Sequence, residues 1–312
     1  MRDKGFKNLD EQIEIFRQKG LVINNEKYAK DVLVRENYFF LNGYRHLFMK
    51  GDDKKKFIEG TTFEELYSLF LFDREFRNIL FKNLLIIENN TKSIISYQLS
   101  KKYGYKENDY LKPENFDTDF DKQRQVDDLI KKMKRQIRIN GSQHSATKHY
   151  LSNYGYIPLW VLVKVLSFGI ISEFYLILKS EDKQSIANIY NLTVNDLSNY
   201  LPLLANYRNV CAHEDILYEN KTQREIDNTV YHTLLGIKKK DGVYVKGKND
   251  IFALFIILRQ MLSSDDMKKM ISEVDTALKN LEFNLNSITI EKVLDRMGFP
   301  YNWQEIANIE KR

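Results

Sequence analysis

The feature that most constrains the fold is a long stretch without glycine or proline. After Thr62 the next glycine is Gly104, and no proline lies between them. Thr62 is a favourable N-cap, and Glu65 three residues later completes a capping-box pattern. A helix of about forty residues would be about 60 Å long at 1.5 Å per residue. The sequence therefore predicts a long scaffold helix, continuous or broken once.

Other parts of the chain are also poor in helix breakers, with 13 glycines and 4 prolines in 312 residues. Residues 8–35 alternate apolar and charged positions on either side of Gly20, which predicts two short helices. Asn42-Gly43 predicts a turn among aromatic residues. Residues 159–178 are apolar on nearly every side, as in a buried central helix.

Thr193 is the expected N-cap of a further helix, which runs towards residue 212. Two more helices are expected near residues 250–263 and 266–281. Asp241-Gly242 lies between short β-prone runs and predicts a small hairpin. The expected fold class is mainly α, a helical bundle with additional helices and a small β-hairpin insertion.

No internal repeat or low-complexity linker divides the chain, so a single, mainly helical unit is the simplest partition. Residues 1–60 are expected to form an N-terminal helical extension. Residues 61–240 are expected to form the core, with a basic insertion at about 104–148. Residues 241–312 are expected to form a C-terminal helical segment packed on the core.

The net charge is +5 and the isoelectric point is near 8.9, which admits polyanions such as RNA as partners without selecting one. The most basic helix candidate lies within residues 104–148. It can be a solvated helix face or an RNA-contacting one. Its five cations are Lys131, Lys132, Lys134, Arg135 and Arg138.

The sequence contains no signal-peptide pattern and no run of about 18 apolar residues. A cytoplasmic protein without a membrane partner is expected. The single cysteine, Cys211, cannot form an internal disulfide and lacks the companions of a structural zinc site. We expect no metal site, and we interpret Cys211 as a small buried spacer.

The stretch ANYRNVCAH, residues 205–213, places a cation, an amide and a histidine close together. Four residues separate Arg208 from His213, and Asn209 follows the arginine. On a regular helix the two side chains would point about 140° apart. Both would reach one substrate atom only if the helix ended or bent there, if the long arginine side chain reached round, or if a second chain supplied the partner. The spacing therefore predicts a helix-terminal motif at a composite site in a homodimer.

Such a pair could cleave RNA without a cofactor. Histidine exchanges a proton near neutral pH, and arginine grips a phosphate and offsets transition-state charge. Glu214 and Asp215 directly after His213 should favour its protonated form. A second pair, Arg138 and His144, has five intervening residues and no following asparagine, and we interpret it as a chance match.

RNVCAH resembles the Arg-x4-6-His signature of HEPN ribonucleases, and it is similar to Arg-Asn-x-Cys-Ala-His of abortive-infection (Abi) proteins of the AbiD/AbiF type. YFFLNGYR, FDREFRNILFKNLLIIENN, HYLSNYGYIPLWVLVKVLSFG and MGFPYNW agree in the same order. The resemblance implies a HEPN-like helical core in residues 61–240. It also implies a homodimeric, metal-independent endoribonuclease that acts as a toxin in anti-phage defence. Inhibition by a small-RNA or protein antitoxin is implied as well.

Position by position, the resemblance makes Arg208 and His213 the catalytic pair and Asn209 their polar support. Glu88 matches an acidic position that orients such an arginine, and its other interpretation is an ordinary exposed helix charge. Lys164, where the family commonly has an acidic residue, departs from the pattern. The alternative function is a HEPN module that binds RNA or a protein without cutting.

Several aromatic and histidine residues remain. Tyr44 and Arg45 could stack on RNA and grip it, or belong to the core. His46 and His149 lie in aromatic surroundings and are interpreted as packing or hydrogen-bonding residues. His232 has no visible partner in the sequence.

Overall fold

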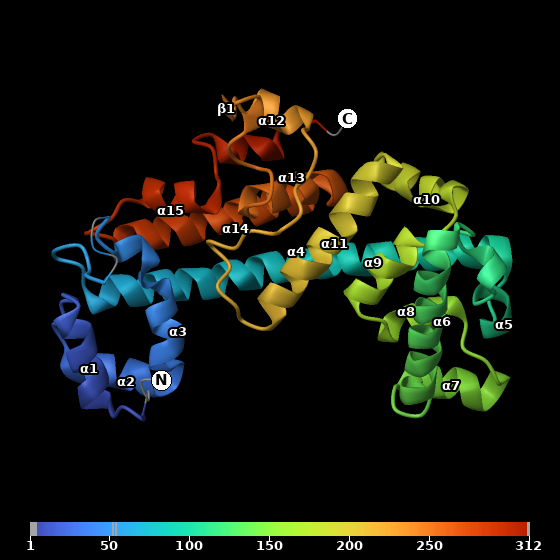
Figure 1. The fold of residues 1–312 in the computed structure, drawn as a ribbon, viewed down its shortest axis with the longest axis horizontal. Helices are drawn as coiled ribbons and strands as arrows, with labels where there is room; N and C mark the ends of the chain where they lie inside the picture. The colour runs from blue at the N-terminus through green and yellow to red at the C-terminus, as the bar shows by residue number, and fades with distance from the viewer. Residues whose placement is uncertain (1–4, 52, 54, 311–312) are drawn as a thin grey trace.

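The structure is a computed structural model that describes residues 5–51, 53 and 55–310. Its axis is α4 (Phe63–Tyr103), an unbroken helix of 41 residues (Figure 1). The side chain of Thr62 accepts from the N–H of Glu65, whose carboxylate accepts from the N–H of Thr62. Gly104, with φ of 94°, ends the helix in a conformation that glycine adopts without strain. The predicted long helix is confirmed, and it is continuous.

The N-terminal region contains the two predicted short helices and a third one. The Asn42-Gly43 turn prediction was wrong, because these residues form the last turn of α3 and the chain continues directly into η1. A Cβ atom on Gly43 would lie 2.7 Å from Ile216 Cδ1, so glycine allows a close approach here. The elements are α1 (Leu9–Gln18), α2 (Glu26–Glu36), α3 (Tyr38–Gly43) and the 3-10 helix η1 (Tyr44–Phe48).

The region after α4 folds into short helices at the far end of α4 (Figure 1, green). The single helix predicted for residues 159–178 was wrong, because the chain becomes extended at Leu166. The Ser167 side chain then accepts from the N–H of Ile170 and starts a new helix. The elements are α5 (Glu107–Tyr110), η2 (Pro113–Asn115), α6 (Phe120–Asn140), α7 (Ser145–Tyr154), α8 (Leu159–Val165), α9 (Phe168–Leu176) and α10 (Ser180–Ala187).

The C-terminal third contains the remaining predicted helices and the hairpin. Lys239 pairs with Tyr244 across the two strands, and both Asp241 and Gly242 between them have positive φ, which suits this tight turn. The elements are η3 (Asn188–Tyr190), α11 (Val194–Ala212), α12 (Val230–Leu234), β1 (Lys239–Lys240), β2 (Val243–Tyr244), α13 (Ile251–Met261), α14 (Ser264–Phe283), α15 (Ile290–Met297) and η4 (Trp303–Ala307).

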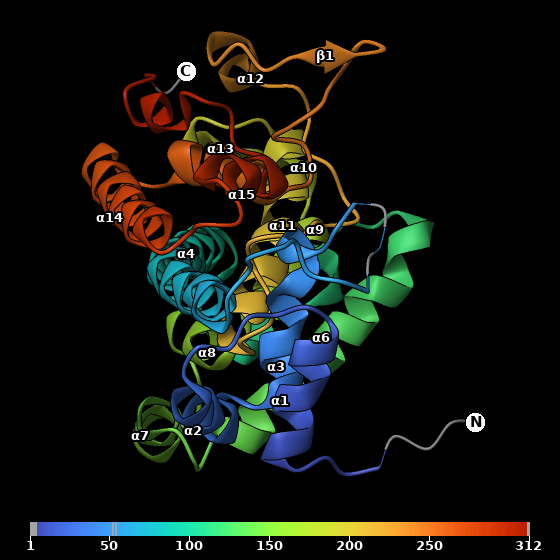
Figure 2. The same ribbon diagram turned by 90° about the vertical axis from the view of Figure 1, so that its left-hand side faces the viewer.

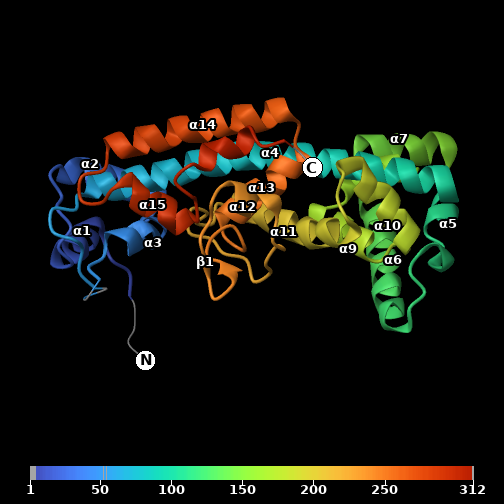
Figure 3. The ribbon, with the colours of Figure 1, turned by 90° about the horizontal axis from the view of Figure 1, so that it is seen from above.

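Helices cover α4 on more than one side (Figures 2 and 3). α14 lies beside the first half of α4, where Lys82 Nζ is 2.7 Å from Glu273 Oε2, and α11 crosses α4 on the opposite side. The mainly α fold with a small β-hairpin is confirmed, whereas the division into three segments stays a prediction. Within the described ranges, no helix combines the length and apolarity needed to cross a membrane.

Candidate active site

His213 lies at the end of α11, as its C-cap residue. Its backbone N–H donates to the carbonyl of Asn209 at 2.9 Å, and its side chain is exposed. Glu214 follows with φ of 59°, a left-handed conformation in which the chain turns away from the helix. The helix-terminal position predicted for the motif is confirmed.

Arg208 lies one turn before the end of α11 and faces α4. Its Nε is 3.1 Å from Glu88 Oε2, and its guanidinium carbon is 5.7 Å from the centre of the Phe81 ring. Lys92 Nζ donates to the other carboxylate oxygen of Glu88 at 2.7 Å. The Glu88 side chain is only 5% exposed, so it is not an ordinary exposed helix charge. It contacts Arg208 at Nε.

The rest of the guanidinium is available. The Arg208 side chain is 29% exposed, and neither of its terminal nitrogens has a hydrogen-bond partner among the described residues. Two parallel N–H groups of an arginine match the geometry of two phosphate oxygens. Arg208 is therefore held at one nitrogen and free to bind an anion with the other two.

A cleft of about 560 Å³ lies beside His213, between the end of α11 and the segment from α2 to η1. Arg208 and Asn209 do not line it. The structure therefore places Arg208 against α4 and His213 at a cleft, as the helical spacing predicts. Other side chains at the cleft include Arg35, Phe39, Phe40, Arg45, His46 and Arg74.

Two arginines of the cleft carry uncompensated charge. Arg74 is paired with Glu36, at 2.5 Å between Nη2 and Oε2. Arg35 and Arg45 instead donate to the backbone carbonyls of residues 31 and 42, at 3.1 and 2.7 Å, and form no ion pair with a described carboxylate. The cleft beside His213 thus presents two guanidinium groups without a carboxylate partner, and Glu214 and Asp215 also line it. The RNA contact of Arg45 stays a prediction.

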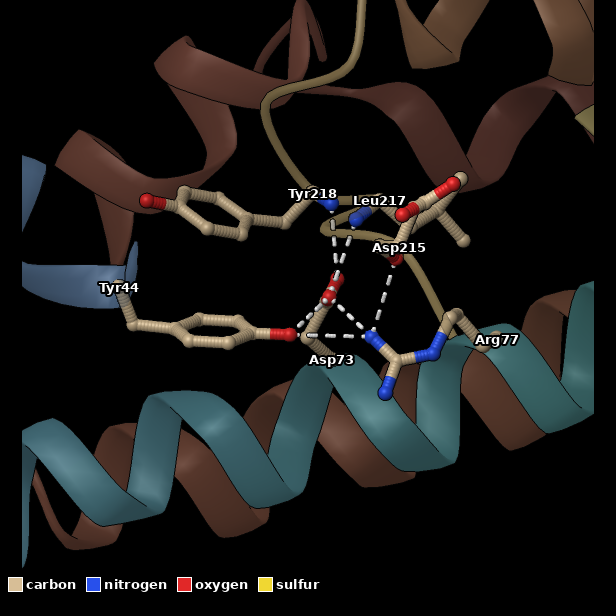
Figure 4. A network of polar contacts seen from close by, with 6 residues as sticks. All are labelled: Tyr44, Asp73, Arg77, Asp215, Leu217 and Tyr218. Atoms are coloured by element: carbon tan, nitrogen blue, oxygen red, sulfur yellow. Dashed lines mark hydrogen bonds and ion pairs between the residues drawn. The ribbon is translucent and has the colours of Figure 1, made fainter. Parts of the chain in front are cut away.

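A buried polar network fixes the chain immediately after the motif (Figure 4). The Asp73 carboxylate is fully buried and accepts from Tyr44 Oη at 2.8 Å, from Arg77 at 2.5 Å and from the backbone N–H groups of residues 217 and 218 at 3.0 and 2.7 Å. Arg77 also donates to the carbonyl of Asp215 at 3.3 Å. These bonds hold the segment that follows His213 against α4 and η1.

The predicted stacking of RNA on Tyr44 does not fit its position. Tyr44 is 2% exposed, its ring stacks on Tyr218 with centroids 5.9 Å apart, and its hydroxyl donates to Asp73. Burial raises the pKa of the Tyr44 phenol well above its usual range, so the hydroxyl stays a donor. Tyr44 belongs to the core and supports the cleft from beneath.

The five cations predicted to contact RNA lie on α6, at the far end of the molecule from α3 (Figure 1). All five are exposed, but Lys132 Nζ is 2.7 Å from Glu173 and Lys131 Nζ is 3.9 Å from Asp128. The structure does not bring these residues to the motif. Their RNA contact stays a prediction for a separate surface.

Three other residues take structural positions. His232 is fully buried, its Nε2 lies 2.8 Å from the carbonyl oxygen of Gly247, and burial lowers its pKa. It therefore has a partner that the sequence does not reveal. Cys211 is buried, and burial raises its pKa to about 12, which confirms a small buried spacer rather than a nucleophile. His46 hydrogen-bonds Glu219 at 2.7 Å, as a hydrogen-bonding residue should.

Sequence reasoning missed the Asp73 network and the cleft. Asp73 and Arg77 stand four residues apart in FDREFR, a spacing that brings side chains together on a helix. This spacing is the same as that of an ion pair on a helix surface, because sequence spacing does not show whether the two side chains are buried. Arg35 gave no signal of its own, since the cleft forms only when α2 and η1 pack beside the end of α11.

The comparison with protein families gives one match. The sequence profile of a family described as Abi-like protein matches residues 31–219, more than half of the chain. The chain belongs to the Abi-like protein family. Comparisons with curated proteins and with solved structures gave no match. Family membership connects this Abi-like protein with abortive infection, and the matched residues include Glu88, the motif and the cleft.

Within the described part of this Abi-like protein, no three histidine, cysteine, aspartate or glutamate side chains are grouped as a metal site requires. The charged side chains close to Arg208 and His213 are Glu88 and Lys92 on α4, and Glu214 and Asp215, which follow His213 and line the cleft.

Proposed function

We propose that this Abi-like protein is a metal-independent endoribonuclease that acts as an effector of abortive infection. The observation that carries the proposal is the state of Arg208, which Glu88 holds at Nε while its two terminal nitrogens stay free. An arginine positioned in this way suits a phosphate whose charge grows during reaction. His213 at the helix end supplies a proton-transfer group within the same motif.

The reaction that suits these groups is internal attack by the ribose 2′-hydroxyl on the adjacent phosphate. The bond from the 2′-oxygen to phosphorus forms while the bond from phosphorus to the 5′-oxygen breaks. The products are a 2′,3′-cyclic phosphate and a 5′-hydroxyl. His213 transfers a proton to or from the reacting oxygens, and Arg208 binds the phosphate. The side chain of Asn209 provides a polar group beside Arg208 and His213.

A homodimer would bring the two groups together. Arg208 faces α4 and His213 faces the cleft, so one protomer can supply the arginine and its partner the histidine of a shared site. Asn206, Asn209 and Ala212 are exposed on the last two turns of α11, which leaves this surface open to a second copy. Strictly monomeric protein that cleaves RNA would contradict the composite site.

The proposal also includes a cytoplasmic location and control by an antitoxin, either a small RNA or a protein. In the cleft, Arg35 and Arg45 would bind backbone phosphates of the RNA that passes His213. The alternative is a module that binds RNA or a protein without cutting. The intact motif Arg208-Asn209 with His213 favours the enzyme.

The test is incubation of the purified protein with RNA in EDTA, beside His213→Ala. Cleavage that persists in EDTA and is lost in the variant supports the enzyme. His144→Ala is the matched control, because His144 is exposed and belongs to the chance Arg138–His144 pair. Equal cleavage by wild type and His213→Ala, or no cleavage by either, would contradict the proposal.

A further inference from the structure

A row of aromatic side chains lies between the end of α4 and α8, and the proposed active site does not use it. The Tyr105 ring is 5.8 Å from Trp160 and 5.7 Å from Tyr156, measured between centroids. Tyr154 continues the row, at 6.3 Å from Tyr156 and 5.4 Å from Tyr150. We name this row the aromatic strip; its members are Tyr105, His149, Tyr150, Tyr154, Tyr156 and Trp160.

Four of the six members of the strip are exposed, whereas Tyr150 and Tyr156 are half-buried. Tyr154 is 57% exposed and Trp160 is 44% exposed. Tyr105 and Trp160 also line a groove of about 420 Å³ together with Tyr97 and Lys101 of α4. Single exposed aromatic residues are ordinary, but a contiguous exposed row marks an interaction surface.

The charge around the strip selects the kind of partner. Residues 129–172, which include the second half of α6, α7 and α8, contain seven lysines and arginines and no aspartate or glutamate, whereas the first half of α6 contains three aspartates. Lys106 Nζ lies 5.2 Å from the centre of the Tyr156 ring, and Arg138 and Lys148 line a hollow of about 480 Å³ between α6 and α7. Glu107, which lies outside residues 129–172 in sequence, contacts this region, and its carboxylate accepts from the backbone N–H of Ile157.

We propose that the aromatic strip binds single-stranded RNA. Aromatic rings interleaved with cations bind unpaired nucleotides, since each base stacks on a ring while lysine and arginine neutralise the phosphates. A duplex hides its base faces and would gain only the charge contacts. The choice of RNA rests on the proposed function, whereas the strip itself is separate from Arg208, His213 and the cleft.

Binding is measured in the His213→Ala protein, so that the probe stays uncut. The probe is a fluorescein-labelled uridine 12-mer, which has no secondary structure, and the readout is fluorescence anisotropy. Trp160→Ala and Tyr154→Ala should each weaken binding about tenfold, because one stacked ring contributes a factor of that order. Trp160→Phe keeps an aromatic ring, so this variant should bind the 12-mer nearly as tightly as the protein that carries only His213→Ala. Tyr301→Ala is the matched control, since Tyr301 is 97% exposed and outside the strip.

Intrinsic fluorescence gives an independent readout. The chain has two tryptophans, of which Trp160 is 44% exposed and Trp303 is 2% exposed. Unlabelled uridine 12-mer should quench Trp160, and Trp160→Phe should abolish the quenching. A duplex of the same length should quench far less.

Three results would overturn the proposal. The first is unchanged RNA affinity in both alanine variants, and the second is equal affinity for duplex and single strand. The third is a change in sedimentation velocity of Trp160→Ala at unchanged RNA affinity, which would make the strip a protein interface. Failure of the ribonuclease proposal is visible separately, because strip-dependent binding without cleavage by wild-type protein refutes only the enzyme.

Discussion

Asp73 and Glu88 are two buried carboxylates on the same helix, and each is paired with an arginine. Asp73 is enclosed by Arg77, a tyrosine hydroxyl and two backbone N–H groups. Glu88 contacts Lys92 and one nitrogen of Arg208, whose other nitrogens have no hydrogen-bond partner among the described residues. The same pair chemistry therefore serves two purposes: the closed pair fixes a loop, and the open pair positions a group that can meet a substrate.

The difference shows that burial of the carboxylate alone does not identify a functional site. What separates the two pairs is whether the arginine keeps unused donors. Arg77 is buried and donates to Tyr44, Asp73 and the carbonyl of Asp215 through one nitrogen, whereas Arg208 is partly exposed. Substitution in the first pair should affect stability, and substitution in the second should affect catalysis.

The largest expected effect is on the closed pair. Asp73→Ala should lower the free energy of unfolding by about 3–5 kcal/mol, because it leaves the Arg77 charge and two backbone N–H groups buried without a partner. Urea unfolding followed by circular dichroism measures this loss. Glu75→Ala, an exposed acidic residue on the same helix, is the control and should change stability by less than about 0.5 kcal/mol. Similar losses in both variants would show that the Asp73 network is not closed.

Arg208→Ala should affect cleavage strongly and stability only slightly, in contrast to Asp73→Ala. We expect cleavage to fall by about 10²–10³-fold, as when one transition-state donor is removed. The free energy of unfolding should change by only about 1 kcal/mol, because Lys92 still pairs with the buried Glu88 carboxylate and the Arg208 side chain is partly exposed. Single-turnover cleavage and urea unfolding are measured on the same preparation. Loss of stability as large as in Asp73→Ala would mean that the two pairs do not differ in kind.

Glu88→Gln tests the open pair through its carboxylate. The amide keeps the size of the side chain but loses the charge that holds Arg208, so cleavage should fall by about tenfold. Lys92 also loses its counterion, and the urea midpoint should decrease. Added guanidinium should not restore activity to Glu88→Gln, whereas it should partly restore Arg208→Ala, because only the latter lacks the guanidinium itself.

The same contrast holds for two histidines, because His232 is buried and His213 is exposed. Burial lowers the pKa of His232, so the folded protein keeps it neutral where the unfolded chain, with an ordinary value of 6.5, takes up a proton. The contribution of His232 to stability is thus intact above pH 6.5 and decreases as the pH falls through the lowered pKa. Between pH 7.5 and 5.0, the free energy of unfolding of His232→Gln should decrease by about 1 kcal/mol less than that of the wild type. Urea midpoints across that range measure the difference, and parallel curves would contradict it.

The smallest effect is expected at Cys211, between the two residues of the motif. Because burial raises its pKa to about 12, the thiol stays protonated at pH 8 and should react with a disulfide reagent only after unfolding. Cys211→Ala should retain cleavage within about threefold of wild type. Rapid thiol modification of the native protein, with loss of activity, would show instead that Cys211 takes part in the site.

Local signals were enough for much of the fold. Thr62 with Glu65 and Gly104 mark both ends of α4, and Asp241-Gly242 marks the hairpin, because caps and tight turns depend on a few neighbouring residues. The break between α8 and α9 was not predictable in this way. Ser167 competes with a continuing apolar run, and tertiary packing decides which of them prevails.

The candidate site was predictable only in part. The spacing of Arg208 and His213 correctly placed His213 at the helix end, since the helical repeat is fixed. Glu88 had two open interpretations, because the sequence does not show that α11 covers this face of α4. Tyr44 failed as a stacking residue for the same reason, as an aromatic side chain suits a core and an RNA surface equally.

The unbroken α4 also sets a distance. Arg74 at the cleft and Tyr97 at the groove of the aromatic strip stand on this one helix, 23 residues apart in sequence, which corresponds to about 35 Å along its axis. Because the helix is continuous, the distance between these two positions along its axis is fixed. An RNA fragment shorter than this span could occupy either surface but not both. If both proposals hold, the length of an RNA would decide whether it binds at one surface or at both.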